Sequence, residues 1–197
     1  MPLIYLLRLP SGFFCVTIYL NMKPQVLSSE IVHENPWYKI RHDKLVWTNG
    51  KAGEYFVVEC PPVVVIMCEQ DKKFLTVNLY RYPIDRNSIE FPTGGTKKNE
   101  TPIEGAKREL KEETGYQASE WKEIGLFTSF NGMAHTEIHV FIASGLTRGE
   151  CVLDDAESDM THIWMPVDEW RAKIRTGEII DSESLAAWAM YQEKKSK

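Results

Sequence analysis

The sequence lacks an unbroken hydrophobic run, although its first part comes nearest to one. Two apolar stretches within residues 1–21 are separated by Arg8, Pro10 and Gly12, so there is no span of ~20 residues for a membrane helix. A secretion signal needs a charged start, one apolar block and a small-residue cleavage site, and this order is not kept. Two interpretations stay open: a signal peptide, or an extension that packs loosely or as an extra strand, with Met22 as an alternative start.

Cysteine is scarce and shows no metal-binding pattern. Cys15, Cys60, Cys68 and Cys151 form no C-x-x-C pair and no zinc-like spacing with histidine, so free thiols in a reducing cytoplasm are expected. An excess of positive charge is also missing, because the formal net charge is -5. The composition therefore gives no electrostatic support for nucleic-acid binding, and neither a nucleic-acid nor a membrane partner is expected.

The sequence does contain enough apolar residues for one proper core. Its 197 residues are 43% hydrophobic, with no internal repeat or low-complexity linker. Ordinary domain sizes predict one domain with a small appendage. We divide the chain into an N-terminal extension (1–21), an N-terminal beta-hairpin unit (22–60) and a main domain (61–197).

The most informative stretch is residues 94–116, GGTKKNETPIEGAKRELKEETGY, in which a glycine pair precedes a helix. Thr101 and Glu104 have the spacing of a capping box, and the proline between them occupies the first helical position, where its missing N–H costs nothing. Gly115 supplies the left-handed residue that commonly ends a helix. The pattern predicts a helix of roughly three to four turns over residues 102–114.

Three carboxylates recur along this expected helix. Glu109, Glu112 and Glu113 occupy positions i, i+3 and i+4 beside an apolar stripe. At ~100° per residue, Glu113 should lie closest to the apolar stripe and Glu112 farthest from it. Crowded carboxylates resist ionisation unless a cation joins them, and oxygen-only ligands favour a hard ion, Mg2+ or Mn2+. The cluster is therefore a candidate metal site.

A solvated acidic helix face is the alternative to a metal site. Glutamate is a good helix former, and Lys107 and Lys111 could pair with the acids. The preceding glycines and the cap favour the metal site, because the full spacing is specific. Arg108 has Glu104 and Glu112 one turn away on either side.

Residues 26–59 change to strand-like pieces, VLSSEIVHE, YKIRHDKLVW and EYFVVEC. Asn49 and Gly50, between two of these runs, form a strong hairpin signal, and a small N-terminal antiparallel unit is predicted. Trp37 and Tyr38 lie within it, where an exposed aromatic could stack on a nucleotide base. A Trp packed under the hairpin is the alternative, slightly favoured by residue type.

The remaining patterns predict strands flanked by helices. Apolar and alternating runs indicate strands at 63–68, 74–80, 123–130, 137–143 and 163–165. Helices are expected at 168–175, ending near Gly177, and at 181–193, with Asp181 or Ser182 as the cap. This order implies an α/β fold, an alpha/beta/alpha sandwich around a mixed sheet.

The spacing within residues 94–116 resembles the Nudix box in all its defining positions. YRYP at 80–83, EFPTG at 90–94 and E-x-H-x-F-x-A at 137–143 are similar to the ADP-ribose pyrophosphatase and nucleoside diphosphate sugar hydrolase branch of that superfamily. The hairpin unit is similar too, so the resemblance covers residues 26–190. It implies the same Nudix-type sandwich that the patterns predict.

The resemblance implies roles for residues in and near the box. Glu109, Glu112 and Glu113 would be ligands of Mg2+ or Mn2+, and a backbone carbonyl of Thr93 or Gly94 would point at the metal. Arg108 would orient the acids together with Glu100. The expected catalytic residues are Glu113, Glu109, Glu157 and Arg108, and the expected metal ligands are Glu109, Glu112, Glu113 and Thr93.

The substrate contacts are also carried by the resemblance. Arg81 is a candidate phosphate or ribose contact. In this branch the hairpin unit often exchanges with a second subunit and brings an aromatic to the base, so Trp37 or Tyr38 is expected to act from the partner of a homodimer. The expected ligand-binding residues are Arg81, Trp37, Glu90, Gly94 and Gly95.

A general base is expected from the acidic segment at residues 154–159. In the resembling branch, a mobile acidic loop before the last helices supplies it. Glu157 aligns best and Asp159 second, although an acidic loop is more often only solvated. His135 and His139 are further candidates, and His139, on an alternating strand, is expected to be packed or to face the substrate.

One departure from the branch pattern affects the substrate. Members that prefer ADP-ribose carry Ser-Pro-Gly in the loop after the second strand beyond the box, whereas this chain has Phe130-Asn131-Gly132. Other nucleoside diphosphate sugars, such as GDP-mannose, are therefore near equals of ADP-ribose.

Three functions are compatible with these residues. The first is metal-dependent hydrolysis of the pyrophosphate in ADP-ribose or another nucleoside diphosphate sugar, where metal ions neutralise the phosphate oxygens and activate a water. The second, hydrolysis of dinucleoside polyphosphates, dNTPs or RNA caps, is disfavoured by the hairpin unit and the lack of a basic groove. The third, a non-catalytic nucleotide-sugar sensor, is disfavoured by the intact box.

Overall fold

The computed structural model describes residues 3–9, 12–18, 23–151, 153 and 159–195. The chain divides into two compact units, Met1–Val58 and Glu59–Lys197. None of the helices formed by the described residues has the length and hydropathy of a membrane span.

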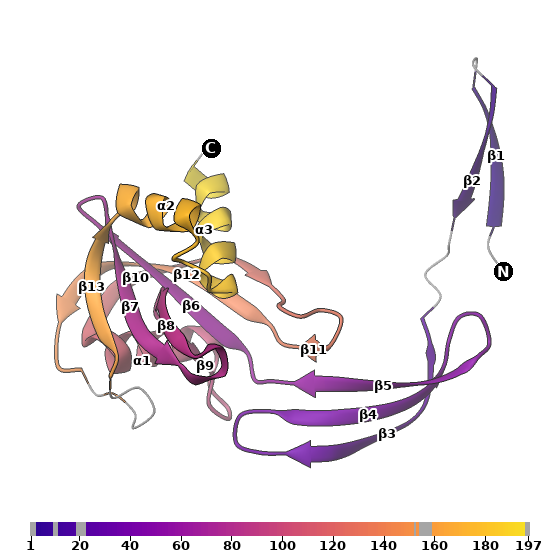
Figure 1. Ribbon diagram of the computed structural model, residues 1–197, viewed down its shortest axis with the longest axis horizontal. Coiled ribbons are helices and arrows are strands. Elements are labelled where there is room, and N and C mark those ends of the chain that lie inside the picture. The colour runs from indigo at the N-terminus through magenta and orange to yellow at the C-terminus, as the bar shows by residue number, and fades with distance from the viewer. Residues whose placement is uncertain (1–2, 10–11, 19–22, 152, 154–158, 196–197) are drawn as a thin grey trace. The chain divides into compact units, whose positions relative to one another are not determined.

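The first unit begins with two short strands, β1 (Leu3–Leu9) and β2 (Gly12–Ile18), drawn in Figure 1. They pair antiparallel with each other, with Leu3 opposite Ile18 and Leu9 opposite Gly12. The extension identified in the sequence therefore contains a strand pair of its own.

The rest of the first unit is an antiparallel sheet in the order β5-β4-β3. Its strands are β3 (Gln25–Glu34), β4 (Lys39–Val46) and β5 (Ala52–Glu59). The predicted hairpin is confirmed at the turn between β4 and β5, where Gly50 has φ 81° and its N–H donates to the carbonyl of Trp47 at 2.8 Å. Glycine adopts this left-handed conformation at no steric cost.

Trp37 is not packed under the hairpin, so the expectation slightly favoured by residue type is wrong. Its exposed fraction is 75%. The side-chain oxygen of Asn35 accepts hydrogen bonds from the backbone N–H groups of Trp37 and Tyr38, both at 2.9 Å. This turn fixes the backbone between β3 and β4 locally, so no apolar packing of the indole is needed to hold it.

The second unit is built on a mixed sheet in the order β10-β12-β6-β7-β13, with β8 beside β7 and β9 beside β6. β12 and β6 run parallel, and the other pairs are antiparallel. The strands are β6 (Val63–Gln70), β7 (Lys73–Arg81), β8 (Arg86–Glu90), β9 (Thr93–Gly95), β10 (Tyr116–Phe127), β12 (Ile138–Arg148) and β13 (Thr161–Pro166), and the short strand β11 (Ala134–His135) is not part of this mixed sheet.

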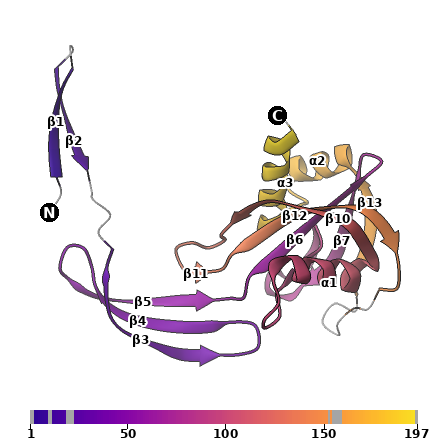
Figure 2. The same cartoon turned by 180° about the vertical axis from the view of Figure 1, so that it is seen from behind.

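Helices cover both faces of this sheet, as Figures 1 and 2 show: α1 (Pro102–Thr114) on one face, α2 (Val167–Thr176) and α3 (Ser182–Lys195) on the other. Neighbouring residues of β6 face opposite layers. Val64 belongs to a core cluster with Leu110 of α1, whereas Val65 belongs to one with Trp170 of α2 and Tyr191 of α3. The expected alpha/beta/alpha sandwich is confirmed.

The observed and predicted strand boundaries differ most just after the helix at 102–114. β10 begins at Tyr116, earlier than the predicted start at residue 123, because Gly115 ends α1 in a left-handed conformation (φ 72°) and the chain reverses at once.

The sequence patterns did not predict β8 and β9. The sequence of β8 is RNSIE, with little apolar alternation, and β9 has only three residues.

Candidate active site

The glycine loop packs directly against α1. β9 pairs with β6, with Thr93 opposite Val65 and Gly95 opposite Val63. A Cβ built on Gly94 would lie 2.2 Å from Cδ of Glu109, so any side chain at this position would force the carboxylate of Glu109 to move. Glycine at position 94 therefore lets the loop lie against Glu109 without displacing its carboxylate.

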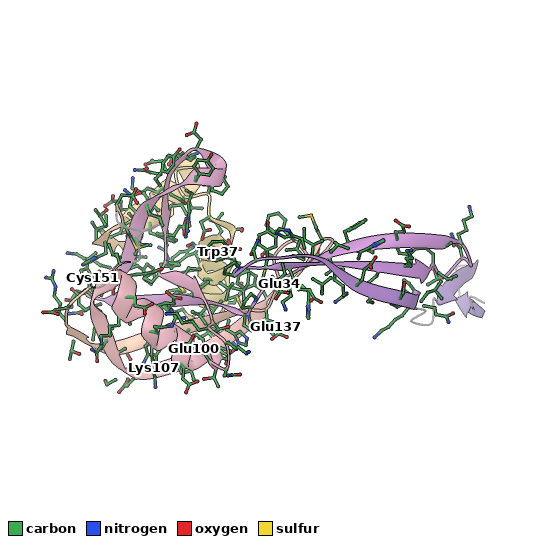
Figure 3. All side chains as sticks on the ribbon, turned by 90° about the horizontal axis from the view of Figure 1, so that it is seen from below. Glu34, Trp37, Glu100, Lys107, Glu137 and Cys151 are labelled. Atoms are coloured by element: carbon green, nitrogen blue, oxygen red, sulfur yellow. The ribbon has the colours of Figure 1, made fainter. Side chains whose placement is uncertain are left out.

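α1 begins and ends as the sequence predicts. The backbone N–H of Thr101 donates to Oε2 of Glu104 at 2.8 Å, and its hydroxyl donates to the same atom at 2.6 Å. At the other end, the N–H of Gly115 donates to the carbonyl of Lys111 at 2.9 Å. Sγ of Cys151, labelled in Figure 3, lies 3.0 Å from the carbonyl of Glu112. Both ends of the acidic helix are therefore held by specific partners.

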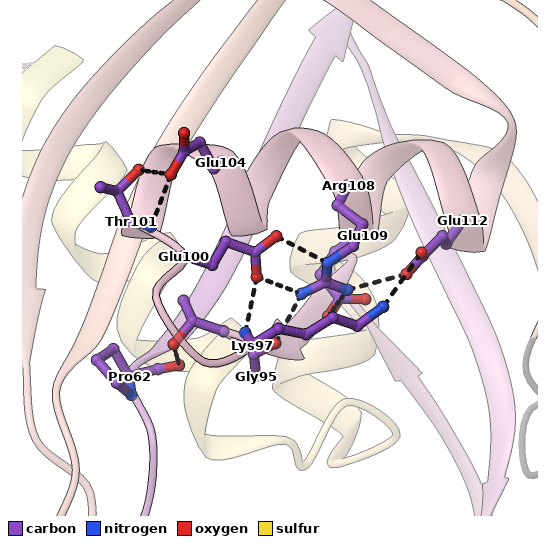
Figure 4. A network of polar contacts seen from close by, with 10 residues as sticks. Pro62, Gly95, Lys97, Glu100, Thr101, Glu104, Arg108, Glu109 and Glu112 are labelled. Atoms are coloured by element: carbon purple, nitrogen blue, oxygen red, sulfur yellow. Dashed lines mark hydrogen bonds and ion pairs between the residues drawn. The ribbon is translucent and has the colours of Figure 1, made fainter.

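Arg108 connects the acids of this region, as Figure 4 shows. Its Nε and Nη2 donate to the two oxygens of Glu100 at 2.9 and 2.8 Å. Nη1 donates both to Glu109 at 2.6 Å and to Glu112 at 2.9 Å, and Nη2 also donates to the carbonyl of Gly95 at 2.9 Å. One guanidinium thus ties the loop and two helical carboxylates together.

The ion pairs of the cluster shift protonation towards the charged forms. The hydrogen bonds from Arg108 hold the pKa of Glu100 below its usual value. The same bonds, with those to Glu109 and Glu112, raise the pKa of Arg108 further. Glu112 also pairs with Lys97, whose Nζ lies 3.5 Å away. Arg108 and Lys97 therefore both contribute charge compensation to the cluster.

The predicted order of burial among the three acids is confirmed. Glu113 has an exposed fraction of 2%, whereas the side chains of Glu109 and Glu112 are 12% and 33% exposed. The backbone N–H of Thr93 donates to Oε2 of Glu113 at 3.2 Å. The buried carboxylate therefore meets the start of the glycine loop.

The donor set of the cluster suits a hard divalent cation. Its side-chain donors are carboxylate oxygens, which such ions prefer. As placed in the described part of the chain, however, no group of three or more His, Cys, Asp or Glu side chains converges to hold a metal ion. Glu109 and Glu112 converge instead on Nη1 of Arg108, so a divalent ion would compete with that guanidinium for the same two acids.

A second charged pair lies at the ends of β7 and β8. Nε of Arg81 donates to Oε1 of Glu90 at 3.0 Å, and Nη2 donates to Oε2 at 2.5 Å. Glu90 is only 3% exposed. The negative charges of Asp181 and Glu113 also act on Arg81. The sequence pointed to Arg81 and Glu90 through their motifs, but neither to their pairing nor to the proximity of Asp181.

The other sequence-predicted residues belong to other parts of the chain. Trp37 belongs to the first unit, and Glu157 lies outside the described residues. Oδ2 of Asp159 accepts a hydrogen bond from the backbone N–H of Tyr80 at 3.3 Å. His139 is half-buried and lies 2.7 Å from Glu123, and His135 is exposed.

Lysines one turn along α1 were expected to pair with its acids if the helix face were only solvated. Lys107, labelled with Glu100 in Figure 3, lies on that helix. The ion pairs of Glu109 and Glu112 instead go to Arg108, with Lys97 as an additional partner of Glu112. This arrangement favours an organised acidic site over a solvated face.

Comparison with protein families covers most of the chain. The model of the NUDIX domain matches residues 59–187. A second model, the nucleoside diphosphate sugar hydrolase N-terminal domain, matches residues 25–58.

Individual relatives align along most of their own length. The methanol dehydrogenase activator of Bacillus methanolicus is 30% identical over 165 residues, which are 83% of this chain and 86% of that protein. The ADP-ribose pyrophosphatase of Mycobacterium tuberculosis (strain ATCC 25618 / H37Rv) is 31% identical over 165 residues, 82% of this chain and 80% of that one. A crystal structure of an ADP compounds hydrolase has the same fold, with a TM-score of 0.77 and 19% identity, covering 89% of this chain and 96% of that chain.

Proposed function

This chain belongs to the Nudix family, in its ADP-ribose pyrophosphatase branch, and on that premise we propose that it hydrolyses the pyrophosphate bond of ADP-ribose or another nucleoside diphosphate sugar, such as GDP-mannose. The products are a nucleoside monophosphate and a sugar phosphate. The supporting observation is the set of acids that Arg108 gathers against the glycine loop.

Nudix hydrolases generally use divalent metal ions, and we assign Glu109, Glu112 and Glu113 as the side chains that hold Mg2+ or Mn2+, with the backbone of Thr93 beside them. When bound, the metal supplies charge neutralisation of the phosphates and an activated water. Arg108 orients the acids, because its guanidinium already holds two of them in place.

We assign Arg81, near the acidic cluster, as the residue that contacts the diphosphate of the substrate. Nε and Nη2 of this residue bind Glu90, whereas Nη1 takes no part in that pair. Glu90 thereby fixes the guanidinium plane, and Gly94 and Gly95 let the backbone approach the phosphates. Trp37, exposed in the first unit, is assigned to the base of a substrate bound by the partner subunit.

The general base is assigned to Glu157, on the alignment of its acidic segment alone. Asp159, the second candidate, is engaged by the backbone of Tyr80, which gives it an anchoring contact at the end of that segment. His139 is paired with Glu123, which leaves it a weaker candidate than Glu157.

A turnover screen with Mg2+ and with Mn2+ tests the proposed function. The panel holds ADP-ribose, GDP-mannose, UDP-glucose, a dinucleoside polyphosphate and a dNTP, with products resolved by chromatography. We expect nucleoside monophosphate from one or more sugar conjugates, and loss of turnover in Glu113→Gln with retained folding, because the change removes a charge and almost no volume. Cleavage of the polyphosphates alone would replace the proposed substrate, and binding of a nucleotide sugar by the wild type without turnover would indicate a sensor.

The relative from Bacillus methanolicus favours a second candidate function, stimulation of a methanol dehydrogenase. Addition of the purified chain to such a dehydrogenase tests it. Acceleration by the wild type but not by Glu113→Gln would link the stimulation to hydrolysis, and no acceleration by either would remove this candidate.

We further propose a homodimer and a cytoplasmic location. The apolar residues exposed along β3 support an interface in the first unit, namely Val26, Leu27, Ile31 and Val32. Cys60, Cys68 and Cys151 are free thiols, as expected in a reducing compartment.

A further inference from the structure

The residue just before α3 is an acid that belongs to neither the metal cluster nor the family box. Asp181 caps this helix: its Oδ2 accepts a hydrogen bond from the N–H of Ser184 at 2.7 Å, and its carbonyl accepts one from Leu185 at 3.0 Å. Ser182, the other cap that the sequence allowed, bonds Glu183 instead. The cap is therefore a carboxylate.

A buried hydroxyl fastens this cap to the strand segment that carries Glu90. Ser184 is fully buried, and its Oγ accepts a hydrogen bond from the backbone N–H of Phe91 at 2.9 Å. Phe91 is the residue after Glu90, and Asp181, three positions before Ser184, lies near enough to the Arg81–Glu90 pair for their charges to act on one another. The position of α3 and that of the pair are fixed by the same contact.

Three carboxylates act on one guanidinium. Arg81 is held by Glu90 and also experiences the charges of Asp181 and Glu113. Burial, followed by the charge of Glu90, raises the pKa of Asp181 to about 7. Glu183 on α3 raises it further, whereas the hydrogen bonds from Ser184 lower it. The charge of Asp181 therefore changes within the physiological pH range.

We propose that Asp181 is a positioning residue that acts through Arg81: it fixes the start of α3 beside the Arg81–Glu90 pair, and its charge sets how much of the positive charge of Arg81 remains to hold a phosphate. This inference rests on the proposed function, in which Arg81 contacts the diphosphate. With Asp181 neutral, Arg81 faces Glu90 and Glu113; with Asp181 ionised, it faces a third carboxylate.

The direction of the effect follows from these charges. A rise in pH ionises Asp181, offsets more of the charge of Arg81 and weakens its hold on an anionic diphosphate. A diphosphate diester stays fully ionised through this range, so its own charge does not change. Asp181→Asn keeps a side chain that caps helices well and removes the titrating charge, so this variant should resemble the low-pH wild type at every pH.

The test compares binding and turnover at pH 6 and pH 8.5. The dissociation constant of the α,β-methylene analogue of ADP-ribose is measured with Mg2+ by calorimetry, and the KM and kcat of ADP-ribose are measured in parallel. Between the two pH values, the wild type should lose about three- to tenfold more affinity than Asp181→Asn, the size expected of one additional charge near the surface, with the change in KM rather than in kcat.

Two other variants separate charge from packing. Glu193→Gln removes one charge from the exposed far end of α3 and should keep the pH dependence of the wild type. Asp181→Ala removes both the cap and the charge, so it should melt at a lower temperature than Asp181→Asn while sharing its flat binding profile.

Thermal stability gives a readout that needs no ligand. Because the folded state raises the pKa of Asp181, its neutral form contributes stability that is present below the unfolded pKa and is lost as pH rises to about 7. The melting temperature of the wild type should therefore fall relative to Asp181→Asn over that window.

Each result bears on a distinct claim. Equal changes in affinity for the wild type and Asp181→Asn would overturn the role of Asp181 while leaving the proposed function in place. A wild type that neither binds the analogue nor cleaves any nucleoside diphosphate sugar of the turnover panel would overturn the proposed function and the inference with it.

Discussion

At the scale of single residues, the lack of a side chain at Gly94 keeps the carboxylate of Glu109 in its place. A methyl group at this position would overlap the carboxylate of Glu109, since the built Cβ lies 2.2 to 2.6 Å from its three carboxyl atoms. Gly94→Ala should therefore displace a proposed metal ligand and lower kcat/KM by about 100-fold, the cost of an ångström-scale misplacement. Steady-state kinetics with the preferred substrate measure this loss.

The neighbouring glycine provides the control for this substitution. A Cβ built on Gly95 meets no atom within 4 Å, so Gly95→Ala adds the same methyl group without a clash and should keep the wild-type melting temperature. Wild-type kinetics in Gly94→Ala would mean that Glu109 is not required where the structure places it.

The partners of Arg108 show what a sequence can and cannot specify at this scale. Helical spacing offered Glu104 and Glu112, and the contact with Glu112 is present. Glu104 is engaged by Thr101 instead. The bidentate partner is Glu100, which lies eight positions away and outside the helix. Family resemblance suggested this partner, but its geometry depends on the path of the loop.

At the scale of elements, the cap of α1 determines how firmly the acidic helix begins. Thr101→Ala removes the hydroxyl that bonds Glu104 and should destabilise the protein by about 1 kcal/mol, lowering the melting temperature by about 2–4 °C. Calorimetry measures the shift. Thr101→Ser retains the hydroxyl, so its melting temperature should stay near that of the wild type. An equal fall in melting temperature in both variants would contradict the capping role.

The elements that the sequence predicted are those with a strong periodic or terminal signal. α1 has both a capping box and a terminal glycine, and β6 has a continuous apolar run, so both were found. β8 and β9 are held by pairing to β7 and β6. Their own residues carry no pattern that predicts this tertiary contact. For the same reason, Asp181 could be named as a cap but not as a neighbour of Arg81.

At the scale of the whole molecule, the first unit presents more apolar surface than a small sheet needs. All ten residues of β3 are exposed, among them Ile31 at 47%. Such a strand at the edge of a sheet is a template for association. Ile31→Glu should convert the proposed dimer to a monomer, because it introduces a charge into the interface. Light scattering coupled to size exclusion measures the mass.

A matched change in the second unit distinguishes the interface from general surface charge. Ile163 of β13 is 50% exposed, and Ile163→Glu should leave the dimer intact. A wild type that stays monomeric at all concentrations would refute the dimer, and dissociation of both variants would argue against β3 as the specific contact.

The link between Phe91 and α3 also has a consequence for synthesis. The backbone N–H of Phe91 finds its partner in Ser184, 93 positions later in the chain. During translation, strands β6 to β9 and the acidic helix α1 are synthesised well before this hydroxyl, so the contact beside Glu90 is absent until Ser184 has been added. Completion of this part of the site therefore depends on the synthesis of α3.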